Sequence, residues 1–342
     1  IGYFTIRNAI TSKSLLPHIR EQAFSVHTLP DAAPGSPTPD GSDPGTTTTQ
    51  PKNKKLNIPM IRIALQSKGR LNEDSLALLA EAGIGIEPSK RKLLSRSDDF
   101  PIEILYLRDD DIPNTVERGV ADIGIVGLNE YEERLCRAEI VHRLGFGKCR
   151  LSLAIPKAEA YTDTTYFAGK RIATSYPVIL RKFLAEKGVE AEIEEIAGSV
   201  EIAPAVGLAD AIFDIVSSGG TLVSNGLKEV ETAMHSEAVL IATPGLDAEK
   251  QALLAQLLFR IESVERSRGK KYILMNIPTE RIPEAAAILP GVKSPTILPL
   301  AEAGWSSMHA VVDEQVLWQK IEQLKAIGAE DILVLALEKM IL

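Results

Sequence analysis

The chain has 342 residues, of which 45% are hydrophobic and 25% charged, and its formal net charge is −8. These values are typical of a globular protein with two or three domains, and an acidic chain is a poor general binder of nucleic acid. No apolar run approaches the roughly 20 residues that a membrane-spanning helix needs. The spacing of Cys136 and Cys149, with no secretory signal, predicts reduced thiols in a cytoplasmic protein. We therefore expect neither nucleic acid nor membrane as a partner.

Residues 1–59 are expected to lie outside the fold, as a disordered or non-native extension. Residues 30–55 are rich in Pro, Gly, Ser, Thr and Asp, and such a segment buries too little apolar surface to offset its ordering entropy. Residues 1–28 have a composition faintly like that of a transit peptide. The simpler interpretation is an over-extended reading frame whose natural start is Met60.

From Met60 onward, short apolar strands alternate with helices, which is typical of parallel, wound sheets. Periodicity predicts strands at 61–65, 102–107, 120–127, 149–156, 171–174, 211–216 and 237–242. It predicts helices at 74–82, 112–119 and 177–184, and a further helix from about Gly226. Two lobes with a cleft between them follow: residues 60–156 with about 226–246 form lobe I, and 157–225 form lobe II. Ligands of such sheets bind beyond the carboxyl ends of the strands.

The C-terminal part, residues 247–342, follows another pattern. A long helix over 249–268 precedes strand 271–276, helix 281–289, strand 309–312, helix 315–327 and strand 331–335. This succession predicts a small ferredoxin-like module. We expect it to be a separate domain.

The strongest chemical signal is the loop 217–221, which follows the buried strand 211–216. A sugar phosphate needs several hydrogen-bond donors and no crowding side chains, and this loop offers hydroxyl groups and glycine amides ahead of a helix start. Two acids on the strand are candidates to accept hydrogen bonds from ribose hydroxyls or to orient a magnesium-bound ligand. The candidate residues are Asp210, Asp214, Ser217, Ser218, Gly219, Gly220 and Thr221. An ordinary strand-to-helix turn is the alternative.

The stretch Glu201–Leu222 resembles the signature of the ATP phosphoribosyltransferase family along its whole length. The resemblance extends from Met60 to the end of the chain, most clearly at Gln66–Arg70, Arg108–Pro113, Asp122–Gly127 and Lys170–Pro177. The C-terminal part is similar to the regulatory domain of the family's long form. The resemblance implies an α/β fold with a two-lobed, periplasmic-binding-protein-like catalytic region and a C-terminal ferredoxin-like (ACT-like) regulatory domain that binds histidine.

The same resemblance implies where the substrates bind. The loop 217–221 and its two acids would take phosphoribosyl diphosphate, and the ATP site would comprise Lys68, Gly69, Arg70, Asp122 and Gly124. The second-lobe wall of the cleft would comprise Thr174, Ser175, Tyr176 and Glu201. Arg70 is the best candidate for an ATP contact because a guanidinium pairs with phosphate or stacks on a base. The alternatives are a surface role beside a helix for Arg70 and a turn or cap role for Asp122.

Two further groups of residues have a less specific signal. Positions that match the family's histidine site are Asn276, Val292, Thr296 and Asp331, with turn and capping roles as the alternative. The three adjacent acids at 109–111 suggest a metal site, but neighbouring residues point in different directions. We expect Asp110 or Asp111 to cap the helix that begins at Ile112 instead. No protein ligand to a metal is assigned, and Mg²⁺ is expected to arrive with the substrate.

The implied enzyme is a glycosyltransferase (pentosyltransferase) that moves the 5-phosphoribosyl group from phosphoribosyl diphosphate to N1 of ATP, the first step of histidine biosynthesis. Histidine would inhibit it, and it would form a homo-oligomer, from dimer to hexamer. The main alternative is a non-catalytic small-molecule-binding or regulatory paralogue of the same fold. A solute receptor is disfavoured because no signal peptide is evident. Another phosphoribosyltransferase class is disfavoured because its two acids are adjacent, unlike Asp210 and Asp214.

Overall fold

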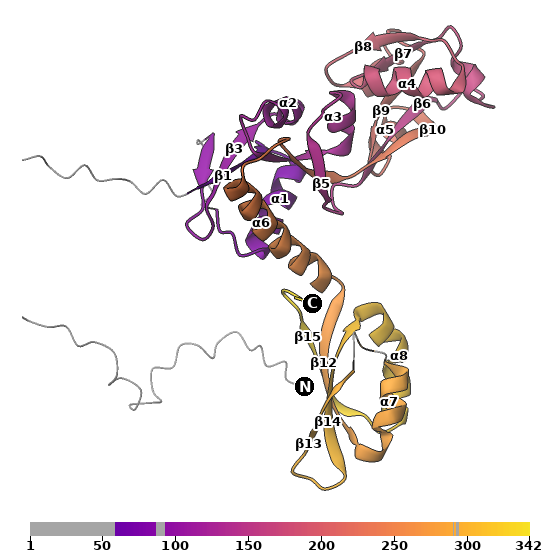
Figure 1. Cartoon of the computed structure of the whole chain (residues 1–342). Coiled ribbons are helices and arrows are strands. Elements are labelled where there is room, and N and C mark those ends of the chain that lie inside the picture. The colour runs from indigo at the N-terminus through magenta and orange to yellow at the C-terminus, as the bar shows by residue number, and fades with distance from the viewer. Residues whose placement is uncertain (1–58, 87–92, 290, 292–293) are drawn as a thin grey trace, which may run out of the picture. The chain divides into compact units, whose positions relative to one another are not determined.

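The computed structural model describes residues 59–86, 93–289, 291 and 294–342. The predicted extension therefore lies outside the described residues except for Pro59, and so does Val292 of the expected histidine site. No helix in these described ranges is long and apolar enough to cross a membrane. Three sheets organise the described part of the chain (Figure 1).

A six-stranded sheet forms the first lobe, in the order β2-β3-β1-β4-β11-β5. Its strands are β1 (Ile61–Gln66), β2 (Leu94–Arg96), β3 (Ile102–Leu107), β4 (Ile123–Gly127), β5 (Glu139–Arg143) and β11 (Ala238–Ala242). β1 pairs in parallel with β3 and β4, whereas β11 is antiparallel to β4. The carboxyl ends of β1, β3 and β4 therefore meet at one edge of the sheet.

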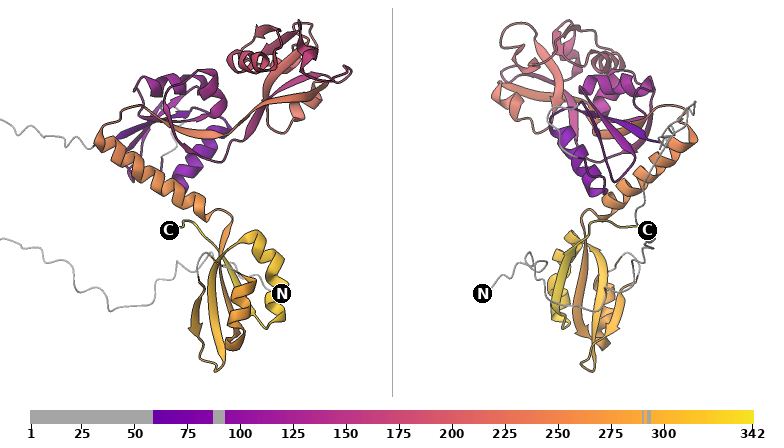
Figure 2. Two further views of the ribbon diagram at one scale, coloured as in Figure 1. Left: turned by 45° about the vertical axis from the view of Figure 1, so that its right-hand side comes forward. Right: turned by 90° about the vertical axis from the view of Figure 1, so that its left-hand side faces the viewer.

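Helices cover both faces of this sheet because its central strands are apolar on both sides. α1 (Arg70–Glu81) and α6 (Ala248–Ser267) bury leucine and isoleucine side chains against one face. α2 (Ile112–Glu117) and α3 (Leu128–Glu133) cover the other face. Figure 2 shows α6 as the long orange helix that runs alongside the first lobe.

A five-stranded sheet forms the second lobe, in the order β10-β6-β9-β7-β8. Its strands are β6 (Cys149–Pro156), β7 (Arg171–Thr174), β8 (Glu192–Glu195), β9 (Ala211–Val216) and β10 (Leu227–Ser236). β7 is parallel to β8 and β9, and β6 is antiparallel to β9 and β10. The helical segments are η2 (Thr164–Phe167), α4 (Pro177–Lys187), η3 (Val200–Ile202) and α5 (Gly220–Ser224). α4 packs on one face and η3 with α5 on the other.

The two lobes are as predicted, but their boundaries are not. β6 and β10 were expected in lobe I, and both pair within the second sheet. Only β11 returns to the first sheet, so the chain passes between the sheets at residues 144–148 and again at Glu237. The helix expected from about Gly226 is also wrong, because α5 begins at Gly220 and Leu227 opens a strand. An apolar strand pattern predicts that a strand is buried, but not which sheet it joins.

The C-terminal domain has a four-stranded antiparallel sheet in the order β13-β14-β12-β15. Its elements are β12 (Lys270–Pro278), η4 (Thr279–Arg281), α7 (Ile282–Ile288), β13 (Thr296–Pro299), β14 (Trp305–Asp313), α8 (Glu314–Ala326) and β15 (Glu330–Ala336). α7 and α8 cover one face (Figure 1). The ferredoxin-like fold is confirmed, with β13 as an unpredicted strand. α6 was assigned to this domain, but its apolar side belongs to the first-lobe core.

Candidate active site

The loop 217–221 lines a small pocket of about 120 Å³ at the carboxyl end of β9. The lining includes Glu201, Asp214, Ser217, Ser218, Gly219 and Thr221, and Gly220 begins α5 beside it. Gly219 has φ 78°, a left-handed conformation that a residue with a Cβ adopts only at a cost. α5 has 5 residues, little more than one turn, so few aligned peptide dipoles lie behind the loop. The structure thus brings together most of the predicted phosphoribosyl diphosphate site.

Asp214 is the acid of this pocket whose ionisation is most perturbed. Burial raises the pKa of its carboxyl group to about 6, and the negative charge of Glu201 adds to the rise. The backbone amide of Ile215 donates to Asp214 Oδ1 at 2.7 Å, and no ion pair to Asp214 is found in the described part of the chain. A carboxyl group that titrates near 6 beside a phosphate-type loop is a candidate to bind a ligand rather than to stabilise the fold.

Asp210, which was predicted for the ribose site, is not among the residues that line this pocket. It precedes β9, and its Oδ2 accepts a hydrogen bond from the backbone amide of Arg171 at 2.9 Å. It therefore fixes the amino end of β9 against the amino end of β7. At about 3.3 Å per strand residue, Asp210 lies roughly 13 Å along the strand from Asp214.

A larger cavity of about 600 Å³ opens at the carboxyl ends of β1 and β4. Gly69 and Arg70 line it, as predicted, whereas Lys68 is exposed and does not. Gly69, with φ 97°, is the N-cap residue that lets the chain turn from β1 into α1. Gln66, from the stretch expected at the cleft, also lines the cavity, and the lining residues that were not predicted include Asp109, Gly127, Asn129, Glu130, Phe146 and Lys148.

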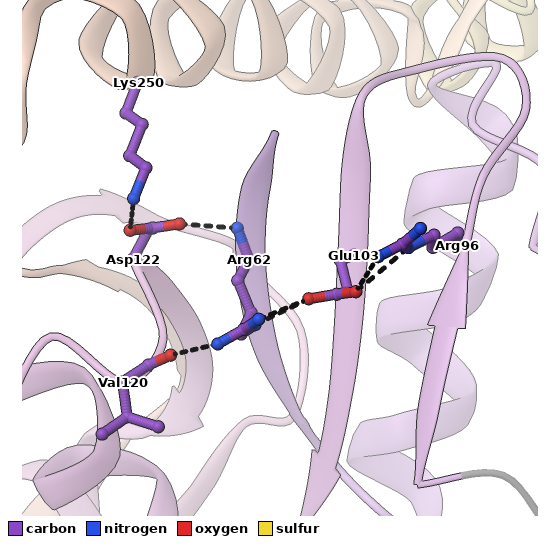
Figure 3. A network of polar contacts seen from close by, with 6 residues as sticks. All are labelled: Arg62, Arg96, Glu103, Val120, Asp122 and Lys250. Carbon is purple, nitrogen blue, oxygen red and sulfur yellow. Dashed lines mark hydrogen bonds and ion pairs between the residues drawn. The ribbon is translucent and has the colours of Figure 1, made fainter. Parts of the chain in front are cut away.

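Asp122 and Gly124, which were predicted for the adenine pocket, lie at the other end of β4. Asp122 is 6% exposed and accepts from Lys250 Nζ and from the Arg62 amide, both at 2.7 Å. Figure 3 shows the network continuing through the Arg62 side chain to Glu103. A Cβ on Gly124 would approach side-chain carbons of α2 to 2.8 Å, so this glycine lets α2 pack on the sheet. Both residues are therefore structural.

The predicted second-lobe wall lies at the carboxyl ends of β7 and β8. Ser175 and Tyr176 line a cavity of about 420 Å³ with first-lobe residues that include Arg108, Asp110 and Glu130. Tyr176 donates its hydroxyl hydrogen bond to Glu130 Oε1 at 2.9 Å, and burial raises the pKa of Glu130. Thr174 is fully buried, with its Oγ1 accepting from the Tyr176 amide at 2.8 Å, and so shapes this turn without facing the cavity.

A second contact between the lobes is made by Glu133 of α3. Its two carboxylate oxygens accept from the backbone amides of Val178 and Ile179, at 2.9 and 3.0 Å, in the first turn of α4. Burial raises the pKa of Glu133, while these two amide bonds oppose the rise. The sequence offered no signal for this contact, because the partners come from different sheets.

The acidic run at 109–111 forms η1, and its side chains do not cap α2 as predicted. Asp111 holds the N-cap position of α2, but its side chain makes no capping hydrogen bond. Asp110 instead faces Arg108 and Arg134, at 3.3 and 3.6 Å. Among the described residues, no group of three or more His, Cys, Asp or Glu side chains is arranged to hold a metal ion.

Among the described residues expected to bind histidine, Asn276 and Asp331 lie together. Asn276 Nδ2 donates to Asp331 Oδ2 at 3.0 Å, from the neighbouring strands β12 and β15. Asp331 has φ 48°, at an irregularity in the pairing of these strands. Thr296 lies on β13, at the opposite edge of the same sheet. The described members of the predicted site therefore lie at two edges of one sheet.

Comparison with known proteins agrees with this two-part architecture. A family model for ATP phosphoribosyltransferase matches residues 108–263, and one for the HisG C-terminal domain matches 267–339. The ATP phosphoribosyltransferase of Phocaeicola vulgatus is 60% identical over 283 residues, which cover 83% of this chain and 100% of that protein. That of Cytophaga hutchinsonii is 53% identical over 282 residues, covering 82% and 99%.

A solved structure gives the same assignment. The chain is similar to one in the ATP phosphoribosyl transferase (HisG:HisZ) complex from Thermotoga maritima, with 29% identity and a TM-score of 0.52. The match covers 59% of this chain and 99% of that one. The chain therefore belongs to the ATP phosphoribosyltransferase family, pentosyltransferases of the first step of histidine biosynthesis, as a long form that carries the C-terminal domain.

Proposed function

We propose that the larger cavity binds ATP and that the loop 217–221 binds phosphoribosyl diphosphate, so that the 5-phosphoribosyl group passes from one to N1 of the other. The observation that carries this proposal is the position of Ser217, which lines both the small pocket and the larger cavity. Both spaces therefore border the loop at the same residue. Transfer between two bound substrates requires such an arrangement, since most of the rate gain comes from holding them in line.

The proposed chemistry needs placement and charge neutralisation more than a strong base. N1 of adenine is already a nucleophile; its bond to the anomeric carbon forms as the bond to diphosphate breaks, with inversion. The hydroxyl groups and amides of the loop hold the 5-phosphate. In this proposal Asp214 accepts hydrogen bonds from ribose hydroxyls, and Arg70 pairs with a phosphate of ATP.

We propose Mg²⁺ as the divalent metal of this reaction. When bound to diphosphate, it would stabilise the charge that develops on the leaving group. Mg²⁺ prefers oxygen ligands and commonly takes most of them from water and substrate phosphates. Glu201 and Asp214 offer carboxylate oxygens in the loop pocket, so the residues present fit a metal that arrives with the substrate.

We also propose that histidine inhibits the enzyme by binding to the C-terminal domain, near Asn276 and Asp331. Their side chains offer an amide and a carboxylate on neighbouring strands, groups suited to a ligand that is both donor and acceptor. Inhibition from a separate domain requires two states with different histidine affinity. A homo-oligomer, from dimer to hexamer, would supply these states. Cys136 and Cys149 are both free thiols, in keeping with a cytoplasmic enzyme.

The test of the catalytic site is an ultraviolet absorbance assay with ATP, phosphoribosyl diphosphate, Mg²⁺ and pyrophosphatase. We expect turnover, and we expect Thr221→Ala to lower kcat/KM for phosphoribosyl diphosphate about tenfold, because one hydroxyl contact to a charged phosphate is lost. Thr162→Ala, at an exposed threonine of the same lobe outside the loop pocket, is the matched control. A folded chain that binds phosphoribosyl diphosphate without turnover would indicate the non-catalytic paralogue instead.

The test of the regulatory proposal is the same assay with histidine added. We expect histidine to suppress turnover, and Asn276→Ala or Asp331→Ala to raise the concentration for half inhibition about tenfold, since each removes one polar contact to a charged ligand. Wild-type turnover that ignores histidine would reject the regulatory proposal and leave the catalytic one intact.

A further inference from the structure

Arg150 lies on β6 directly opposite the last residue before the loop 217–221. In the strand register, Arg150 pairs with Val216 of β9 on one side and with His235 of β10 on the other. β6 is an interior strand of the second sheet, so its backbone is held on both sides. The side chain of Arg150 therefore starts from a fixed point beside the end of β9.

The guanidinium of Arg150 is held in one orientation by Glu229 of β10. Arg150 Nε donates to Glu229 Oε1 at 2.6 Å, and Nη2 donates to Oε2 at 2.5 Å. Glu229 Oε1 also accepts from Ser152 at 2.7 Å and from Thr232 at 3.2 Å. The hydrogen bonds and charge of Arg150, with the bond from Ser152, lower the pKa of Glu229 to about 2. This carboxylate is therefore ionised throughout the neutral range.

The remaining nitrogen of the same guanidinium reaches the loop. Arg150 Nη1 donates to the backbone carbonyl oxygen of Ser217 at 3.2 Å. Ser217 is the first loop residue and lines both the small pocket and the larger cavity. The direction of its carbonyl fixes the direction of the next peptide N–H, because the peptide unit is planar. Holding this oxygen therefore orients the amide of Ser218, and it offsets a partial negative charge that would repel a phosphate.

We propose that Arg150 is a positioning residue that fixes the conformation of the phosphoribosyl diphosphate loop, and that Glu229 orients the Arg150 guanidinium. We call this pair of contacts the brace. A planar guanidinium group, with its several N–H donors, can make two hydrogen bonds to one carboxylate and a third to a carbonyl oxygen. A lysine keeps the charge but not this geometry. The inference rests on the proposed role of the loop, and it predicts that either member of the pair is needed for tight binding of phosphoribosyl diphosphate but not of ATP.

The test compares wild type, Arg150→Lys and Glu229→Gln in steady-state kinetics and in calorimetric binding of phosphoribosyl diphosphate. Both variants keep the volume of the side chain nearly intact, and Glu229→Gln keeps an accepting oxygen while removing the charge. We expect KM and the dissociation constant for phosphoribosyl diphosphate to rise about tenfold to a hundredfold in both, the range of one lost hydrogen bond to a charged group. KM for ATP should change less than about threefold.

The matched control is Arg171→Lys. Arg171 lies on β7 of the same sheet, faces the carboxylate of Asp210 at 3.8 Å and donates to the carbonyl oxygen of Gly207 at 3.3 Å. It therefore makes the same kind of contacts at the end of the sheet away from the loop, and its KM values should stay at wild-type levels. A general loss of sheet stability would lower Tm and the apparent kcat in all three variants, whereas the proposed role of Arg150 and Glu229 predicts a rise in KM for phosphoribosyl diphosphate alone.

Two results would overturn the brace. One is an unchanged dissociation constant for phosphoribosyl diphosphate in both Arg150→Lys and Glu229→Gln. The other is an equal rise of both KM values together with a lowered Tm, which would make the pair a structural one. Wild-type chain that binds phosphoribosyl diphosphate but does not turn over would reject the proposed function alone, since binding by the variants still tests the brace. If Arg150→Lys does not fold, Glu229→Gln decides the question.

Discussion

Asp122, which is buried just before β4, and Asp214, which is half-buried on β9, have opposite electrostatic environments. Asp122 faces the ammonium group of Lys250 at 2.7 Å and the amide of Arg62 at the same distance. Asp214 accepts one backbone hydrogen bond, and burial raises the pKa of its carboxyl group to about 6. One acid has its partners within the fold; the other lies among loop hydroxyls and glycines at a pocket. A carboxylate already satisfied by the protein stabilises it, and one left unsatisfied is available to a ligand.

Replacing Asp214 should give the largest effect on activity. Asp214→Asn removes the charged acceptor for ribose hydroxyls, and we expect kcat/KM for phosphoribosyl diphosphate to fall about a hundredfold or more. The free energy of unfolding at pH 7.5 should stay level or rise. The folded-state pKa is raised, so ionised Asp214 is disfavoured in the folded chain, and the uncharged amide avoids that cost. Kinetics and urea unfolding measure the two quantities; activity within threefold of wild type would contradict the comparison.

Replacing Asp122 should produce the reverse pattern. Asp122→Ala leaves the Arg62 amide and the Lys250 ammonium without their acceptor, which we expect to lower the free energy of unfolding by about 2–4 kcal/mol. At temperatures well below the unfolding transition, kcat/KM should match wild type.

Lys250→Met and the double variant complete a thermodynamic cycle in urea unfolding. A coupling energy near zero would show that the pair does not hold α6 to the first lobe. A large loss of kcat/KM in Asp122→Ala would place this acid in the active site after all.

The pH profile gives the smallest and most specific effect. Asp214 becomes protonated in the free enzyme as pH falls through about 6. Since kcat/KM reports ionisation of the free enzyme, its value for phosphoribosyl diphosphate should fall about tenfold per pH unit below that point. The same profile measured on Asp214→Asn should lose this slope. A slope that persists in the variant would assign the titration to another group, such as the substrate.

Local patterns predicted the residues that the chain itself places together. Ser217 to Thr221 follow one another, and Gly69 and Arg70 sit at a single turn, so sequence adjacency was enough to assign them to a site. Asp122, Gly124 and Asp210 were predicted for the same sites from their place in a motif, without regard to the direction of their strands. All three lie toward the amino ends of their strands, away from the pockets.

Contacts between distant segments could not be predicted in this way. Phe146 and Lys148 reach the larger cavity because the chain passes between the sheets there. Glu133 meets the first turn of α4 across the two lobes. β6 and β10 have the apolar pattern of buried strands, and only pairing with β9 assigns them to the second sheet. Such contacts depend on tertiary packing, so they cannot be predicted from a short segment of the sequence.

The sequence suggests a domain boundary before helix α6, at residue 247. The structure shows that α6 cannot be separated from the first lobe at that point. Leu253, Leu257 and Ile261 complete the hydrophobic core of the first lobe, yet only Arg268 and Gly269 separate α6 from β12 of the C-terminal domain. The same helix thus packs in the core of the first lobe and leads directly into the first strand of the C-terminal domain. Removing residues 247–342 would strip the catalytic region of part of its core. A shortened enzyme without the C-terminal domain has to keep this helix and end just beyond Ser267.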